Sequence, residues 1–308
     1  MKIAFLSTPA FALPSLDMLF RCGHELAVFT QPDRPAGRHA ALTPPPAKVY
    51  AQARGIPVRQ FEKIRLPEGV AALKAYAPDL MVTAAFGQLL SAENLAIPKH
   101  GCINVHASLL PKYRGAAPVQ WAIIGGEAET GVTTMMTDAG LDTGDILLAD
   151  RTAIGPDETA GELLERLSVL GAETLCRTIA ALEAGALTRT PQDEAQATKC
   201  PMLKKEHGRL DFSQAAEAVH NRVRGTNPWP GAYALLDGEL LKIHKTRRTG
   251  RQTGPEPIGL LTGGAKTGLF VRCADAWLEI LELQATGGKR LGAREYLLGK
   301  TLEGKVLV

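Results

Sequence analysis

The sequence predicts an α/β protein with a parallel, doubly wound, Rossmann-like sheet, followed by a small, basic, OB-like β-barrel. Over the first half of the chain, short apolar runs typical of buried strands alternate with amphipathic helical patterns. Such alternation is typical of a parallel sheet covered by helices on both faces. The last third instead carries about five short strand patterns, as small barrels do. A length of 308 residues also favours two domains over one.

The elements of the α/β part follow from apolar periodicity. Strands are expected at residues 2–6, 25–30, 79–84 and 101–105, with helices at residues 14–22, 47–54 and 67–76. A further pair of strands is expected at residues 131–138 and 145–154, and a long amphipathic helix at residues 159–184. Neither GxGxxG nor GxxxxGK[ST] follows a strand. The sheet is therefore expected to bind something other than a dinucleotide or nucleotide phosphate at the carboxyl ends of its strands.

Hydrophobicity drops after residue 184, and this drop marks the expected domain boundary. We predict a catalytic α/β domain at residues 1–184, a linker at residues 185–203 and a barrel domain at residues 204–308. In the last of these a helix is expected at residues 213–224. Strands are expected at residues 232–236, 240–246, 258–261, 268–273 and 277–283, with Asp237-Gly238 as a hairpin turn.

Composition places the chain among ordinary globular proteins, with 45% hydrophobic and 22% charged residues. The five cysteines are dispersed and form no CxxC pair, which argues against a disulfide framework and a zinc site and favours the reducing cytoplasm. The start, MKIAFLSTPAF, is typical of a first strand rather than a signal peptide. Because no apolar stretch is long enough to cross a bilayer, no membrane partner is expected.

Charge is unevenly distributed along the chain. Residues 204–308 hold 17 Lys and Arg against 11 Asp and Glu, whereas the remainder holds 18 against 21. An excess of positive charge on one domain suggests a polyanionic partner such as nucleic acid. A solvated basic surface without a partner explains the same excess equally well.

The clearest candidate for chemistry is the stretch CINVHASLLPKYRG, residues 102–115, in which a buried strand ends at polar residues. Asn104 and His106 point to the same face of that strand, because side chains alternate with period two. An Asn amide can donate a hydrogen bond to a developing oxyanion. A His can move protons near neutral pH. This pair suits acyl transfer through a tetrahedral intermediate better than it suits a polar cap on a turn.

Asp142 lies in GLDTGD, between two expected strands, where a carboxylate could reach over the same crevice. It could hold an imidazole in one tautomer or take a proton from an amine. Taken locally, an ordinary Asx turn explains Asp142 better, and Asp138 and Asp145 are competing carboxylates nearby. The sequence has no nucleophile elbow, no cysteine in a nucleophile context and no HExxH. Direct transfer between two bound substrates is therefore favoured over a covalent enzyme intermediate, with no metal.

These motifs together resemble the folate-dependent formyltransferases. Their signature is Asn-x-His, then SLLP, then an aromatic-Arg-Gly turn, with a later Asp in a GLDTGD-like loop, and all four parts occur here. The resemblance covers essentially the whole chain. It extends to members of the family that act on charged initiator tRNA, through PDRPAGR, GRLDFS and NPWPGA.

The resemblance implies that 10-formyltetrahydrofolate donates the formyl group and that the α-amine of methionine on initiator tRNA accepts it. Asn104 would stabilise the oxyanion, His106 would assist by hydrogen bonding and proton transfer, and Asp142 would help to deprotonate the amine. The folate site would be lined by Ser108, Leu109, Leu110 and Pro111, and by Phe86, Gly87, Gln88, Leu89 and Leu90. The tRNA would contact Arg34, Arg38, Lys242, Lys245, Arg247 and Arg248. A cytoplasmic monomer is expected.

One departure from the family pattern concerns the PDRPAGR loop. The family often carries lysines after the Gly-Arg, whereas here Arg38 is followed by His39 and two alanines. Because phosphate contacts supply much of the affinity for nucleic acid, this loop is expected to contribute less and the basic barrel more. The same barrel lysines and arginines could also be no more than a solvated strand edge.

Four other functions remain open at this point. The chain could formylate an amino-sugar nucleotide, because such enzymes share the Asn-x-His-SLLP core. It could be a non-catalytic RNA-binding protein on the same fold. It could also hydrolyse formyltetrahydrofolate without an acceptor. Formylation of glycinamide ribonucleotide is disfavoured, because that reaction has no need of the C-terminal domain.

Overall fold

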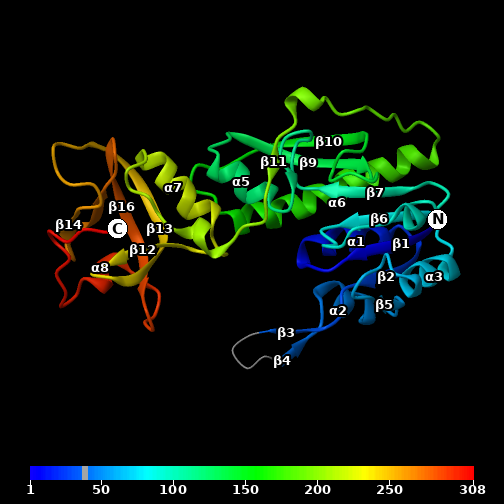
Figure 1. Cartoon of the computed structure of the whole chain (residues 1–308), viewed down its shortest axis with the longest axis horizontal. Coiled ribbons are helices and arrows are strands. Elements are labelled where there is room, and N and C mark those ends of the chain that lie inside the picture. Colours follow the sequence, from blue (N-terminus) through cyan, green and yellow to red (C-terminus); the bar gives the residue numbers. More distant parts are fainter. Residues whose placement is uncertain (37–40) are drawn as a thin grey trace. The chain divides into compact units, whose positions relative to one another are not determined.

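The computed structural model describes residues 1–36 and 41–308, and the chain forms two compact units (Figure 1). The first unit comprises Met1–Gly115, Thr130–Thr152 and Leu164–Lys199. The second comprises Ala116–Glu129, Ala153–Leu163 and Cys200–Val308.

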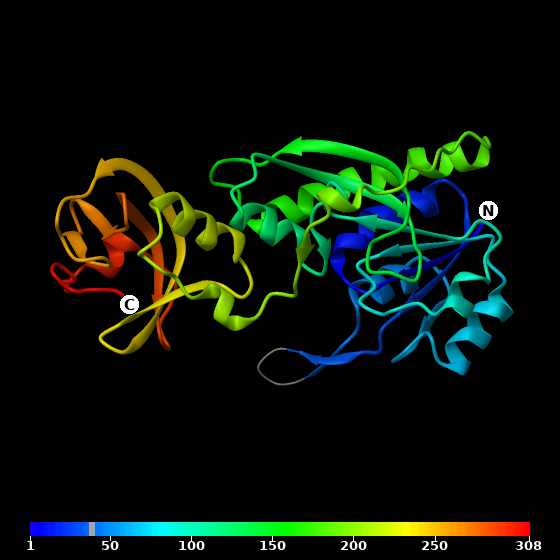
Figure 2. The same ribbon diagram turned by 45° about the horizontal axis from the view of Figure 1, so that its top comes forward.

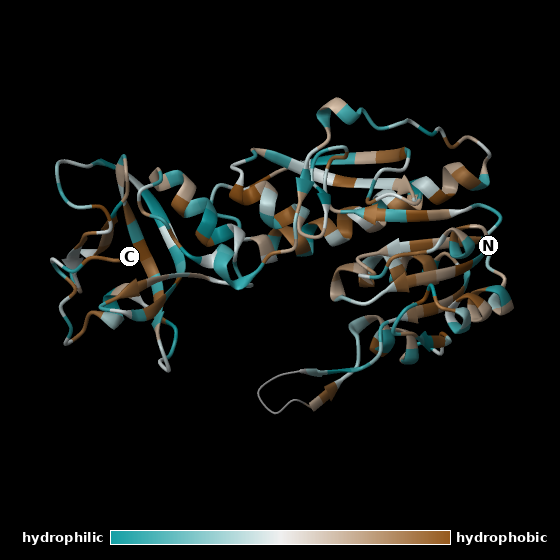
Figure 3. Ribbon diagram, in the orientation of Figure 1, coloured by the Kyte–Doolittle hydropathy of each residue, from teal (hydrophilic) through white to brown (hydrophobic). Residues whose placement is uncertain are grey.

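The first unit is built on a seven-stranded sheet. In spatial order its strands are β10 (Ile146–Ala153), β9 (Glu129–Met136), β7 (Cys102–His106), β6 (Leu80–Ala84), β1 (Lys2–Ser7), β2 (Glu25–Thr30) and β5 (Val58–Gln60). The strands from β7 to β5 run parallel, whereas β9 is antiparallel to β7. Apolar residues fill the central strands, as Figure 3 shows in brown. The predicted mostly parallel, Rossmann-like sheet is confirmed, with an antiparallel strand beside β7.

Helices cover both faces of this sheet. They are α1 (Leu13–Arg21), α2 (Pro46–Gln52), α3 (Pro67–Tyr76), α4 (Ala92–Leu95) and α6 (Ala160–Glu183), with a 3₁₀ turn at Ala10–Ala12. On one face, Leu73 of α3 packs with Met81 and Cys102. On the other face, Gly171 of α6 lies against Val105 so closely that a Cβ there would be 3.0 Å from its Cγ1. Since side chains alternate along β7, Asn104 and His106 lie on the Cys102 face.

The connection at residues 31–46 contains a short hairpin, β3 (Arg34–Ala36) and β4 (Ala41–Thr43). Figures 1 and 2 show it as an arm that leaves the sheet after β2. Its base is fixed because Lys48 Nζ donates to both carboxylate oxygens of Asp33, at 2.8 and 2.9 Å. Arg38, predicted to contact tRNA, lies outside the described residues, as does His39.

The second unit is mostly β-structure. Its sheet order is β12 (Ala232–Leu236), β13 (Glu239–Gln252), β16 (Ala276–Ala285), β15 (Gly268–Arg272) and β14 (Leu261–Gly264), and β17 (Leu291–Gly292) pairs with β16. Its helices are α5 (Pro118–Ile124), α7 (Ala216–Gly225) and α8 (Ala293–Tyr296), with a 3₁₀ turn at Lys205–Gly208. The core includes Val219 and Val223 of α7 with Ile243 of β13 and Leu278 and Ile280 of β16.

The last residues of the chain pair with both edges of this sheet. Leu307 forms a bridge with Leu236 of β12, and Val306 forms one with Leu260, just before β14. The OB-like barrel stays a prediction, which these two bridges favour because they join the two edge strands. Among the helices of the described residues, none has the length and apolar character that crossing a membrane would need.

Candidate active site

The site forms where β7 ends. Asn104 lies beside Thr83 of β6 and Met135 of β9, and His106 lies beside Thr133 of β9. His106 is 6% exposed, whereas Asn104 is only partly buried. The predicted pair therefore shares one face at the carboxyl edge of the parallel strands, where α/β sheets bind ligands.

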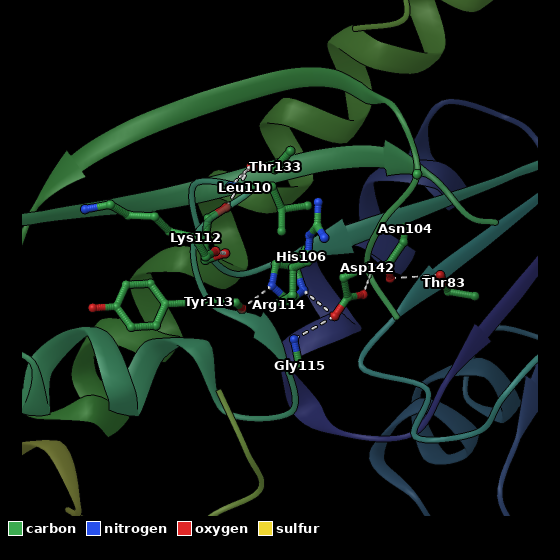
Figure 4. A network of polar contacts seen from close by, with 12 residues as sticks. Thr83, Asn104, His106, Leu110, Lys112, Tyr113, Arg114, Gly115, Thr133 and Asp142 are labelled. Atoms are coloured by element: carbon green, nitrogen blue, oxygen red, sulfur yellow. Dashed lines mark hydrogen bonds and ion pairs between the residues drawn. The ribbon is translucent and has the colours of Figure 1, made fainter. Parts of the chain in front are cut away.

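Thr83 orients the Asn104 amide. The Thr83 hydroxyl donates to Asn104 Oδ1 at 2.9 Å, so the amide oxygen faces β6. The amide nitrogen, Nδ2, consequently faces the other way and donates to Asp142 Oδ1 at 3.5 Å. Figure 4 shows this chain of contacts from Thr83 through Asn104 to Asp142. The donor end of the amide is thus presented to the site.

The backbone of the following turn fixes the His106 ring. His106 Nε2 lies 2.9 Å from the carbonyl oxygen of Tyr113. Because a carbonyl can only accept, Nε2 carries the proton in the neutral ring and Nδ1 is left with its lone pair. Nδ1 faces Asp142 Oδ2 at 3.7 Å (Figure 4). The basic nitrogen of His106 therefore points at the carboxylate.

Asp142 lies in the loop between β9 and β10 and has a φ of +54°, a left-handed conformation that is uncommon for a residue other than glycine. Its Oδ2 accepts a hydrogen bond from the backbone N–H of Gly115 at 2.9 Å. The side chain is 15% exposed. Asp142 thus brings a carboxylate between the Asn104 amide and the His106 imidazole. The competitor Asp138 instead binds its own loop, accepting from Thr143 Oγ1 at 2.8 and 2.9 Å.

The SLLP turn is pinned to β9. Thr133 Oγ1 donates to the carbonyl of Ser108 at 2.7 Å and accepts from the N–H of Leu110 at 3.2 Å. The Ser108 hydroxyl is turned inward and donates to the carbonyl of Lys112 at 2.7 Å. Leu110 is buried, and Leu109 and Pro111 are partly buried. The turn is therefore a rigid wall beside the end of β7.

The second segment expected at the folate, FGQLL, follows the end of β6 and so lies at the same edge of the sheet. Phe86 is buried, whereas Leu89 is 64% exposed. Gln88 ties the segment down, because its Oε1 accepts from Ile64 N at 2.7 Å and its Nε2 donates to Phe61 O at 2.8 Å. A hollow of about 230 Å³ opens beside it, lined by Glu62, Lys63, Arg65, Gly87, Gln88 and Leu89. In the described part of the chain, no three His, Cys, Asp or Glu residues group as metal ligands would.

Comparison with protein families settles what this arrangement belongs to. The model of the formyl transferase family matches residues 1–179, and that of the formyl transferase C-terminal domain matches residues 202–301. The chain belongs to the formyl transferase family. The folate-dependent formyltransferase family predicted from the motifs around Asn104 is therefore confirmed.

Curated relatives in this family match nearly the whole chain. A methionyl-tRNA formyltransferase of Geobacter metallireducens is 51% identical over 98% of this chain and 97% of its own. One of Ruminiclostridium cellulolyticum is 46% identical over 98% of each chain. Among solved structures, HypX of Aquifex aeolicus with tetrahydrofolic acid aligns with a TM-score of 0.65 at 18% identity, over 96% of this chain and 47% of that one. WlaRD, a sugar 3N-formyl transferase, aligns with a TM-score of 0.70 at 19% identity, over 94% and 99%. These structural likenesses establish the fold.

The residues expected to contact tRNA that the structure describes lie on two strands, β3 and β13. Arg34 of β3 forms an ion pair with Glu62 at 2.5 Å, with more than half of each side chain exposed. On β13, Arg247 pairs with the buried Glu279 at 2.5 Å and Arg248 pairs with Glu217 at 3.0 Å. Lys242 and Lys245 are exposed on the same strand. Part of the arginine charge on β13 is therefore balanced by carboxylates within the unit.

Sequence reasoning missed three residues that contact Asn104 or Asp142 in the candidate site: Thr83, Gly115 and Gln192. Thr83 is an ordinary strand residue by pattern, and its register opposite Asn104 is a property of the sheet. Gly115 acts through its N–H, which no side-chain pattern reveals. Gln192 lies in a polar stretch without periodicity, and its Nε2 donates to the carbonyl of Asp142 at 2.9 Å. In the GLDTGD motif, only the resemblance could select Asp142 over its neighbours.

Proposed function

We propose that this formyl transferase moves the formyl group of 10-formyltetrahydrofolate to the α-amine of methionine on charged initiator tRNA, for translation initiation. The relatives named methionyl-tRNA formyltransferase support this substrate pair, because they are about half identical along almost the entire chain. The observation that carries the chemistry is the convergence of Asn104, His106 and Asp142, with His106 Nδ1 3.7 Å from Asp142 Oδ2.

Asn104 serves the formyl oxygen in this proposal. When the amine attacks, negative charge develops on that oxygen, and a donor that is already aimed at it lowers the barrier without reorganisation. Asn104 Nδ2 suits this role because Thr83 holds the other end of the amide at 2.9 Å. Its contact with Asp142 Oδ1 is long, at 3.5 Å, so little is lost when Nδ2 turns to a substrate.

His106 and Asp142 handle the proton. A bond forms between the amine nitrogen and the formyl carbon, the bond from that carbon to N10 of the folate breaks, and the proton lost by the amine must reach N10. His106 Nδ1 holds the lone pair that can take this proton, since Nε2–H is committed to Tyr113 O. Asp142 stabilises the imidazolium that results and orients the amine. No covalent enzyme intermediate is required.

The SLLP turn and the FGQLL segment lie at the edge of the sheet where this chemistry takes place, and we assign the folate to them. We assign Lys242, Lys245, Arg247, Arg248 and the β3–β4 arm with Arg34 and Arg38 to the tRNA. Residues 1–184 then carry the chemistry and, through the β3–β4 arm, some of the tRNA contacts, and residues 204–308 carry the remaining tRNA contacts. A monomer in the cytoplasm, where initiator tRNA is charged, fits this role, and sedimentation of the purified chain tests the monomer.

The test is formyl transfer from 10-formyltetrahydrofolate to methionine-charged initiator tRNA, with charged elongator tRNA and a UDP-amino sugar as competing acceptors. We expect formylmethionine on initiator tRNA alone, and loss of about 10²–10³ in kcat for Asn104→Ala. His106→Ala should also lose activity, whereas His100→Ala, a histidine in the turn before β7, should not. A formylated sugar, formate release without acceptor, or full activity of both site variants would each refute the proposal.

A further inference from the structure

The segment expected as a linker makes hydrogen bonds to elements that carry the candidate site residues. Thr190 and Ile146, at the start of β10, exchange backbone hydrogen bonds of 2.8 and 2.9 Å. Eight residues later, Thr198 O accepts from the N–H of Arg114 at 2.9 Å, and Thr198 Oγ1 accepts from the N–H of Tyr113 at 2.8 Å. Residues 190–198 therefore run from the Asp142 loop to the turn whose carbonyl holds His106.

Gln192 binds the Asp142 loop directly. Its Nε2 donates to the carbonyl of Asp142 at 2.9 Å and to the carbonyl of Gly144 at 2.7 Å. One amide thus spans three residues of the loop on both sides of Thr143. These two contacts fix the backbone that carries the Asp142 carboxylate.

Arg114 decides which end of the Gln192 amide faces the loop. Arg114 Nε donates to Gln192 Oε1 at 2.9 Å, and a guanidinium has no acceptor. The amide nitrogen must therefore face the two carbonyls. Arg114 itself is 4% exposed and makes two contacts with Glu194, at 3.0 and 2.7 Å. The Glu194 carboxylate raises the pKa of Arg114, and this contact lowers the pKa of Glu194.

The loop needs such a restraint. Asp142 has a φ of +54°, a left-handed conformation that is uncommon for a residue other than glycine and persists where its surroundings hold it. Gly144 packs so closely on β9 that a Cβ would lie 1.8 Å from Met136 O. Met136 N also donates to Asp145 O at 2.9 Å, which fixes the end of the loop but not its middle. Gln192 supplies hydrogen bonds at the strained residue itself.

We propose that Gln192, oriented by Arg114, is a positioning residue that holds the Asp142 carboxylate beside His106 and Asn104. Its role in transfer rests on the proposed function, whereas its hold on the loop does not. Gln192→Glu keeps the shape and the contact to Arg114 but has no proton to give to the carbonyls. Gln192→Ala removes the contacts without adding charge. Gln196→Glu and Gln196→Ala are matched controls, because Gln196 is exposed on the same segment and its side chain donates to Asp193 at 2.8 Å.

The kinetic experiment measures formyl transfer to initiator tRNA. We expect both Gln192 variants to lower kcat about 10–100-fold, as misplacement of a reacting group by about 1 Å does. KM for folate and for tRNA should stay within about threefold of wild type, and the Gln196 variants should match wild type. In an Asp142→Asn background, Gln192→Ala should cost little more, because residues that act as a unit are not additive. Two results would overturn the proposal. One is an equal kcat for the Gln192 and the Gln196 variants, and the other is full additivity of the kcat losses of Gln192→Ala and Asp142→Asn.

Hydrogen exchange of the full chain separates this inference from the proposed function. Backbone amides in residues 138–145 should exchange about tenfold faster in Gln192→Ala than in Gln196→Ala, with strand β6 unchanged in both. If exchange in the loop were unchanged, Gln192 would not hold the Asp142 loop, whatever the substrate of the enzyme is. Faster loop exchange in Gln192→Ala, together with a wild-type chain that formylates no tRNA, would refute the proposed substrate and support the role of Gln192 in holding the Asp142 loop.

Discussion

Thr83→Val tests whether the orientation of the Asn104 amide matters for transfer. Valine has nearly the shape of threonine but lacks the hydroxyl that donates to Asn104 Oδ1 at 2.9 Å. Thr83 is 7% exposed within β6, so the substitution leaves the packing of the sheet in place. The Asn104 amide loses a partner and becomes freer to turn its oxygen toward the site.

The size of the effect follows from the hydrogen bond that is removed. A neutral hydrogen bond of this kind contributes about 1 kcal/mol, which corresponds to about fivefold in a rate or a population. Asp142 Oδ1, at 3.5 Å, still favours the productive orientation, so the loss cannot approach that of Asn104→Ala. We therefore expect kcat to fall about 3–10-fold, KM to change little, and the unfolding midpoint to fall by about 2 °C.

The assay is steady-state formylation of charged initiator tRNA by wild type, Thr83→Val and Thr83→Ser. Serine keeps the hydroxyl and loses only a methyl group, so its kcat should return to within about twofold of wild type. Equal kcat for valine and wild type would refute the reasoning, because Asn104 would then be held without Thr83. Equal loss for valine and serine would assign the effect to packing.

Two further predictions concern the second unit. The double variant Lys242→Ala with Lys245→Ala should raise KM for tRNA several-fold. It should also reduce the slope of log affinity against log salt concentration by up to about 1.8, at about 0.9 per lost phosphate contact. Lys266→Ala, at another exposed lysine, should change neither quantity. The second prediction concerns His220, whose pKa is lowered by burial. Its ring nitrogens lie 2.9 Å from Thr246 Oγ1 and 3.1 Å from Pro156 O. The charged groups that face it are Asp157, Arg224 and Arg248. A lowered folded-state pKa means that the unfolded chain binds the proton first. Stability is therefore full above pH about 6.5 and is lost as the pH falls through the folded pKa. The drop in unfolding midpoint between pH 7 and pH 5 should be smaller in His220→Gln, and an equal drop would exclude His220 as its cause.

Prediction from sequence succeeded where a feature is local and periodic. Six of the seven strands of the central sheet are predicted from their apolar runs, whereas β5, with the sequence VRQ, is not. The bounds predicted for α3 match the observed ones, because its pattern begins at a proline and ends at Tyr76. The shared face of Asn104 and His106 follows from the alternation of strand side chains alone. In contrast, the sequence predicts no strand in the PDRPAGR loop, where the structure has the β3–β4 hairpin, because a Pro-rich stretch without alternation carries no strand signal.

Contacts between distant segments could not be predicted in this way. Arg114 and Gln192 are separated by 78 residues, and Thr83 and Asn104 by 21. Asp138 and Asp142 are indistinguishable locally. The structure separates them because Asp138 accepts from its own loop at Thr143, whereas the left-handed backbone at Asp142 directs its carboxylate to the N–H of Gly115.

The same physical arrangement orients two of the three ambiguous side chains, His106, Gln192 and Asn104. An amide or a neutral imidazole can present either a donor or an acceptor to a substrate, and a partner with only one capacity removes the choice. The carbonyl of Tyr113 can only accept, so it leaves the lone pair of His106 on Nδ1. The guanidinium of Arg114 can only donate, so it turns the nitrogen of Gln192 to the Asp142 loop. The partner of Asn104 differs, because the Thr83 hydroxyl can both donate and accept a hydrogen bond. The orientation of the Asn104 amide therefore also depends on Asp142, which accepts from the other end of the amide. Asn104 is therefore the least firmly held of the three, and the fall in kcat of about 3–10-fold that we expect for Thr83→Val measures that remaining freedom.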